Sequence, residues 1–197
     1  MDALQELQAA RARLVSELLA GRRSLERALH DGIQQDLTAI TVQLQIAREQ
    51  AATSSGAEPE LLDALRLEVH AALDAVRGLA EEVYPPLLDA HGVGAALPGA
   101  ARGAGVRLRL RGDESVRASR DAEAAALFAC RAAFAQCGEG AEVTAELRDD
   151  DGRLRIELTP VPAPPDQLAR DLVEGAGGTL AWAPDRLTLR SQSRSAR

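Results

Sequence analysis

The first part of the chain carries apolar side chains at the spacing of a helix. Between residues 4 and 47 this pattern predicts one long amphipathic helix. Its apolar positions are Leu4, Leu7, Leu14, Leu18, Leu25, Leu29, Ile33, Leu37, Ile40, Leu44 and Ala47. The upstream steps follow a coiled-coil rhythm, whereas the steps from Leu25 to Leu37 advance by fours, a phase shift that locally unwinds a supercoil. The shift is predicted around His30.

A second amphipathic helix follows residues 51–59, a polar segment of small residues that is typical of a turn. Its apolar positions keep three-four spacing until Pro85 and Pro86 stop the helix. These positions are Leu62, Leu65, Val69, Ala72, Val76, Leu79 and Val83. The two helices predict an antiparallel hairpin. Because such a hairpin cannot cover two apolar stripes by itself, we expect a homodimer in which a second copy completes a four-helix bundle. The alternative is that the stripes pack on the C-terminal half of the same chain.

Beyond the two prolines, apolar and polar residues alternate, which predicts strands. The expected strands are residues 106–111, 142–148, 154–158, 179–182 and 186–189, with a tight turn at residues 149–152. An alanine-rich helix is expected over residues 120–137 and a short helix over 166–174, after the proline-rich residues 160–165. Helices on one face of a mostly antiparallel sheet make an α+β sandwich. We therefore expect a hairpin domain in residues 1–92, an α+β domain in residues 93–190 and a disordered tail in residues 191–197.

Composition narrows the function classes. With 46% apolar and 27% charged residues, the chain of 197 residues is expected to form one or two compact domains. Residues 1–92 carry 15 acidic residues against 8 Arg, which argues against a nucleic-acid binder. We find no membrane segment and no signal peptide, which predicts a cytoplasmic protein. The two cysteines, Cys130 and Cys137, are expected to pack in the core.

Some residue types are absent, and their absence excludes mechanisms. All 23 basic residues are Arg, and the chain contains neither Lys nor Asn. This excludes a phosphate-binding P-loop lysine and a Schiff-base lysine, and it removes Asn as a metal ligand. No metal-binding cluster is predicted.

The candidate chemistry centres on His30, which is followed by Asp31 and lies one turn before Gln35. An imidazole nitrogen can attack phosphorus while the other nitrogen keeps its proton for a carboxylate, and Asp31 is placed to be that partner. Phosphoryl transfer depends mainly on positioning, so an exposed His on a rigid helix is a sufficient design. Gln35 is placed to orient an attacking water in the hydrolytic direction. The alternative is an ordinary surface histidine, which is also our interpretation of His70 and His91.

Two strings carry a family resemblance. RALHDGIQQDLTAI and, after the second helix, EEVYPPLLDAHGVGAAL resemble the NarX/DesK-like sensor histidine kinases, which act on response regulators with helix-turn-helix output domains. The resemblance covers residues 22–100. It implies an H-D-x-x-x-Q motif in which His30 accepts phosphate, Asp31 acts as base and Gln35 supports phosphatase action. It also implies a response regulator receiver domain as partner, and ATP with magnesium as the cofactors of the family.

The C-terminal half resembles the family's Bergerat-type ATPase domain, but its nucleotide motifs differ. The family's magnesium-binding Asn falls near Gln136. The adenine-reading D-x-G-x-G box should follow residues 154–158, where the sequence is TPVPAPP. The later glycine box and its lid are missing as well, because Pro165 leads almost directly into the last helix. We therefore expect a degenerate ATPase-like domain in which no residue is assigned to ATP or magnesium.

Together these patterns predict a two-component signalling protein. Its expected activity is phosphotransfer between His30 and a receiver aspartate, or dephosphorylation of that receiver. Three alternatives stay open: an active autokinase with an atypical nucleotide site, a subunit phosphorylated by an intact partner kinase, and a non-catalytic pseudokinase scaffold.

Overall fold

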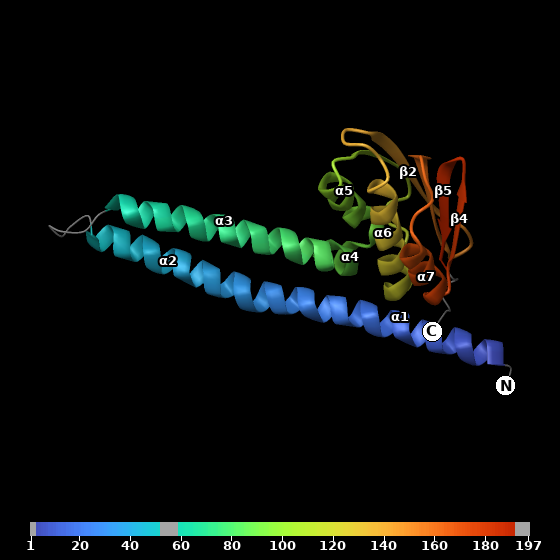
Figure 1. Ribbon diagram of the computed structural model, residues 1–197, viewed down its shortest axis with the longest axis horizontal. Helices are drawn as coiled ribbons and strands as arrows, with labels where there is room; N and C mark the ends of the chain where they lie inside the picture. Colours follow the sequence, from blue (N-terminus) through green and yellow to red (C-terminus); the bar gives the residue numbers. More distant parts are fainter. Residues whose placement is uncertain (1–2, 52–58, 192–197) are drawn as a thin grey trace. The chain divides into compact units, whose positions relative to one another are not determined.

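The computed structural model describes residues 3–51 and 59–191 (Figure 1). The tail predicted at residues 191–197 and the turn predicted at 51–59 lie almost wholly outside these residues. The helices are α1 (Ala3–Ala28), the π-helix η1 (Leu29–Ile33), α2 (Gln34–Ala51), α3 (Pro59–Val83), α4 (Pro86–His91), α5 (Val93–Gly103), α6 (Arg120–Phe134) and α7 (Gln167–Gly175). The strands are β1 (Arg107–Gly112), β2 (Glu142–Asp149), β3 (Leu154–Val161), β4 (Thr179–Ala183) and β5 (Asp185–Arg190).

The chain divides into two compact units. One is Gly21–Pro85, and the other combines Met1–Ala20 with Pro86–Arg197. The start of α1 thus belongs to the same unit as the sheet. In this stretch Val15 and Leu19 are buried, whereas the residues of the predicted stripe, Leu4, Leu7, Leu14 and Leu18, are exposed.

The Gly21–Pro85 unit is the predicted antiparallel hairpin. Helices α2 and α3 lie side by side, and an ion pair between Arg48 Nε and Asp63 Oδ1, 2.8 Å apart, joins the end of one to the start of the other (Figure 1). Leu73 and Ala80 of α3 are buried. Large apolar side chains nevertheless remain exposed on the hairpin, namely Leu25, Ile33, Ile40, Val42, Ile46, Leu61, Leu65, Leu67 and Leu79.

The other unit contains a five-stranded sheet with the order β1-β2-β3-β5-β4. Strands β1 and β2 are parallel and all other neighbours are antiparallel, so the sheet is mostly antiparallel, as predicted. Alternate residues of β2 and β3 are buried, and α5, α6 and α7 lie on this one side of the sheet (Figure 1). The predicted α+β sandwich is confirmed. Helices α4 and α5 were not predicted from the pattern, because Gly92 separates two short helices and the second contains Pro98, a residue that usually ends a helix.

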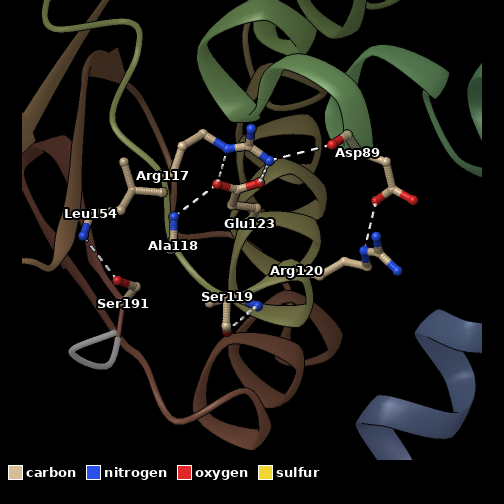
Figure 2. Close-up of polar contacts among 9 residues, drawn as sticks. Asp89, Arg117, Ala118, Ser119, Arg120, Glu123, Leu154 and Ser191 are labelled. Atoms are coloured by element: carbon tan, nitrogen blue, oxygen red, sulfur yellow. Dashed lines mark hydrogen bonds and ion pairs between the residues drawn. The ribbon is translucent and has the colours of Figure 1, made fainter. Parts of the chain in front are cut away.

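A buried carboxylate fixes the start of α6 (Figure 2). The Glu123 side chain is 2% exposed, and its Oε1 accepts hydrogen bonds from Arg117 Nε and from the Ala118 backbone N–H, both at 2.8 Å. This carboxylate raises the pKa of the Arg117 guanidinium through a charge-assisted hydrogen bond. Arg117 Nη2 also donates to the Asp89 carbonyl at 3.4 Å, and Arg120 Nε lies 3.5 Å from Asp89 Oδ1. These contacts connect α4, the first helix after Pro85, to α6.

Replacement of Glu123 by Gln is expected to lower the free energy of unfolding by about 2 kcal/mol, because it leaves the partly buried Arg117 guanidinium without its anion. Chemical denaturation of the full chain measures the loss. The matched control is Glu142→Gln on β2, whose ion pair with Arg109 is exposed and should contribute no more than about 0.5 kcal/mol. Equal effects of the two substitutions would contradict a special role for the buried pair.

Candidate functional site

His30 lies in η1, a single π-helical turn between α1 and α2. The backbone N–H of Gln34 donates to the carbonyl of Leu29, five residues earlier, so this turn holds one residue more than an α-helical turn. The wide turn lies where the apolar residues shift their phase in the sequence. Both η1 and the helix that follows it, α2, contact α3.

The extra residue changes which side chains share a face. In a regular α-helix, residues five apart point about 140° apart around the axis, whereas one additional residue in the turn reduces this to about 40°. The π turn therefore brings His30 and Gln35 toward one face. Both side chains are exposed, as are Asp31 and Gly32, and η1 contains no buried residue. The three predicted site residues are therefore all accessible.

The relation between His30 and Asp31 is looser than the predicted acid-base pair. As consecutive helical residues they point in different directions. Within the part of the chain that the structure describes, no hydrogen bond joins their side chains. An incoming phosphoryl group or partner must therefore complete the arrangement.

The other two histidines differ from His30. Nδ1 of His70 lies 2.8 Å from the Arg66 carbonyl on the preceding turn of α3, so its ring is tied to its own helix. His91 is the last residue of α4 and is exposed. Their structural role stays a prediction.

The positions at which the resemblance would place the nucleotide motifs lie at the end of α6 and between β3 and α7. Gln136 lies beyond the end of α6 and is exposed. Residues 159–161 continue β3, and Asp166 begins the next helix by accepting a hydrogen bond from the Ala169 N–H at 2.8 Å. The chain between β3 and α7 is therefore a short connection of residues 162–166.

The acidic residues between β2 and β3 form a turn. Asp149 Oδ1 accepts a hydrogen bond from the Gly152 N–H at 2.6 Å, and Asp150 forms an ion pair with Arg155 at 3.4 Å. An open groove of about 480 Å³ beside this turn is lined by Asp149, Asp150, Asp151, Arg153 and Arg190. Its three carboxylates and two guanidinium groups do not resemble a glycine-rich phosphate cradle.

A further feature of the described residues is their lack of a metal-ligand cluster. In residues 3–51 and 59–191, no group of three or more His, Cys, Asp or Glu side chains is placed to hold a metal ion. The buried Cys130 thiol, whose pKa burial raises to about 12, is also unsuited to be a ligand or nucleophile. In the same ranges, no helix has the length and apolar character needed to cross a membrane.

Comparison with known proteins gives one family match. Residues 21–88, which include His30, Asp31 and Gln35, match the family model described as histidine kinase. No curated protein matches the chain.

Three solved structures are loosely similar to the chain. They are the histidine kinase AdeS of Acinetobacter baumannii (12% identity, 79% of this chain and 96% of that one, TM-score 0.38), a histidine kinase of Burkholderia phymatum STM815 (17%, 98% and 99%, 0.38) and a bacterial phosphotransferase (15%, 98% and 98%, 0.42). None of these TM-scores exceeds 0.42, so the likeness to histidine kinases is carried by the match of residues 21–88.

Replacement of Gly32 by Ala is expected to raise the free energy of unfolding by about 0.5–1 kcal/mol, because alanine is the better helix former. A Cβ at this position would meet no atom within 4 Å, and the backbone is not in a conformation that requires glycine. Thermal or chemical unfolding measures the gain, and Gly78→Ala, at an equally open position of α3, is the matched control. A loss of stability only at Gly32 would show that the π turn itself requires glycine.

Proposed function

We propose, from the match of residues 21–88 to the family model described as histidine kinase, that this chain is a two-component phosphotransfer protein whose hairpin presents His30 to the receiver domain of a response regulator. The observation that supports this proposal is the exposed π turn: His30, Asp31 and Gln35 are all accessible there, and the wide turn brings His30 and Gln35 toward one face. A partner domain can reach such a surface without rearrangement of the helix. The open position of Gly32 beside His30 also leaves room for close approach.

The proposed step is transfer of a phosphoryl group between two side chains. One His30 nitrogen attacks the phosphorus of the receiver's aspartyl phosphate, the bond from phosphorus to the aspartate oxygen breaks, and the aspartate leaves as a carboxylate. Asp31 accepts a hydrogen bond from the other ring nitrogen and stabilises the positive charge that develops on the imidazole. The reverse reaction returns the phosphoryl group to the receiver.

Gln35 is assigned to the hydrolytic direction. Its side-chain amide orients a water molecule for attack on the same phosphorus, which releases inorganic phosphate and the free receiver aspartate. The small angle between His30 and Gln35 around the π turn supports this assignment, because both groups must face one phosphoryl group.

We assign residues 1–92 to the dimerisation and phosphoacceptor region, residues 93–190 to a degenerate ATPase-like domain and residues 191–197 to a tail. The exposed apolar residues of the hairpin support a homodimer that completes a four-helix bundle. The phosphoryl group then comes from a phosphorylated receiver or from an intact partner kinase. The runner-up functions are an autokinase with an atypical nucleotide site and a scaffold without catalysis.

Incubation with a labelled, phosphorylated receiver domain is expected to move label to the protein or to release phosphate. Substitution His30→Gln should abolish transfer, because the amide cannot accept a phosphoryl group stably. Gln35→Ala should slow phosphate release by about tenfold or more while transfer persists. Gel autoradiography and phosphate release measure the two outcomes. The matched control is His70→Gln, an exposed histidine on α3, and equal losses in both histidine variants would overturn the assignment of His30.

Titration with ATP, with and without magnesium, is expected to give no heat of binding in calorimetry, because the positions that would hold the metal and the adenine carry neither Asn nor an Asp-Gly box. Labelling from ATP that requires His30 would instead establish an active autokinase. If ATP does not label the protein, and the phosphorylated receiver neither transfers its phosphate to the protein nor loses it, the scaffold without catalysis becomes the better explanation.

A further inference from the structure

The sheet has one side on which α5, α6 and α7 do not lie. These helices cover the side that holds Val143, Ala145 and Leu147 of β2, so the alternate residues of each strand point the other way (Figure 1). Because the strands pair in register, the outward residues form one surface, which we call the open face. Its members are Arg107, Arg109 and Arg111 of β1, Glu142, Thr144, Glu146 and Arg148 of β2, Arg155, Glu157 and Thr159 of β3, Thr179, Ala181 and Ala183 of β4, and Arg186, Thr188 and Arg190 of β5.

The open face carries a surplus of positive charge. It holds seven arginines against three glutamates, whereas the whole chain has a formal net charge of -7. The side chains of Arg107, Arg109 and Arg148 are well exposed, at 72%, 66% and 59%. This surface therefore has the opposite sign to the protein that bears it.

Ion pairs within the open face do not remove the surplus. Within residues 3–51 and 59–191, no ion pair involves Arg111, Arg186 or Arg190. Each glutamate of the face already has an arginine partner. The pairs are Glu142 with Arg107 and Arg109, Glu146 with Arg148, and Glu157 with Arg155.

Three of the arginines form a row across neighbouring strands. Arg148 is the register partner of Arg155, and Arg155 is the register partner of Arg190. Neighbouring strands lie about 4.8 Å apart, and like charges directly opposite each other are destabilising. Arginines on an edge strand such as β1 can be explained as protection against pairing with another sheet. That explanation does not cover the row, because β2, β3 and β5 are all inner strands.

The composition of the open face indicates which kind of partner it fits. The cores of protein interfaces are enriched in aromatic side chains, and single-stranded nucleic acids stack on them. The open face has no large apolar side chain, and Trp182 lies on the other side of β4, where its Nε1 donates to the Val161 carbonyl at 3.1 Å. Attraction to an anionic lipid surface needs only basic side chains near the headgroups.

We propose that the open face binds the anionic surface of a lipid bilayer. Guanidinium groups can bind the headgroup phosphates through two hydrogen bonds each. Screening limits the attraction to about 10 Å at 0.1 M salt, so a bilayer responds to the face that lies on it rather than to the net charge of the chain. The contact does not involve His30, and it adds a location to the proposed phosphotransfer.

An acidic turn at one end of the open face opposes this contact. It consists of Asp149, Asp150 and Asp151, between β2 and β3, and only Asp150 pairs with an arginine of the face, Arg155. Asp151 has a positive φ of 55°, a conformation that Asn adopts as readily as Asp. Asp151→Asn therefore removes one opposing charge without backbone strain.

The test is sedimentation of the full chain with vesicles of phosphatidylglycerol and phosphatidylcholine in equal amounts, at about 0.05 M and about 0.5 M salt. Binding is expected at the lower salt and should fall at least about tenfold at the higher salt. Vesicles of phosphatidylcholine alone should not bind. Arg107→Gln combined with Arg111→Gln should weaken binding by about thirtyfold, and Asp151→Asn should strengthen it by roughly two- to fivefold.

The matched control is Arg13→Gln combined with Arg102→Gln, which removes the same charge from exposed arginines of α1 and α5 and should change binding by less than about twofold. Thermal unfolding checks that both double variants are folded. The absence of binding at low salt, binding that persists at high salt, or equal losses in the two double variants would overturn the proposal.

A duplex DNA oligonucleotide separates the lipid surface from another polyanion. It is expected to bind more weakly than the anionic vesicles at the same salt. Tighter binding of the duplex, lost in the variant of Arg107 and Arg111, would assign the open face to nucleic acid and overturn the proposal. His30→Gln should bind vesicles like the wild type, so failure of the lipid contact and failure of phosphotransfer are distinguishable.

Discussion

The unit that contains the sheet depends on the close packing of α6, a helix whose buried side chains are mostly small. Ten residues of α6 are buried, and most of them are alanines. Because an alanine face is flat and narrow, α6 can lie against the sheet while α5 and α7 pack beside it. A charged group on this buried face has no access to water. Glu123 is therefore tolerated only because Arg117 and the Ala118 amide satisfy its carboxylate.

Periodicity identified nearly all of the regular structure. Alternation located the five strands, and helical spacing located the hairpin and the two helices of the sandwich, because each of these elements buries one face. Helices α4 and α5 escaped prediction because Gly92 and Pro98 interrupt a pattern that is already short. The ion pair between Arg11 and Asp171 could not be predicted, since it joins residues 160 positions apart. Such a pair follows from packing rather than from local spacing.

At the candidate site, too, some features could be predicted from the sequence and others could not. The residues His30, Asp31 and Gln35 could be chosen from their chemistry, and the run of apolar residues spaced by four indicated irregular winding at this point. The form of that irregularity could not be read from the sequence, since a phase shift is compatible with a kink, a stutter or a π turn. The π turn matters because it determines which side chains share a face. In this chain the geometry of the backbone, rather than burial, organises the group.

A π turn also gives a helix an internal degree of freedom. The extra residue can be taken up one position earlier or later along the chain, and each such move turns the residues that it passes by about 100° around the axis. The helix on either side keeps its own packing and length. His30 lies inside the wide turn, so the direction in which its imidazole faces is set by where the helix stores its surplus residue. Torsion within this helix is thereby converted into reorientation of a single side chain.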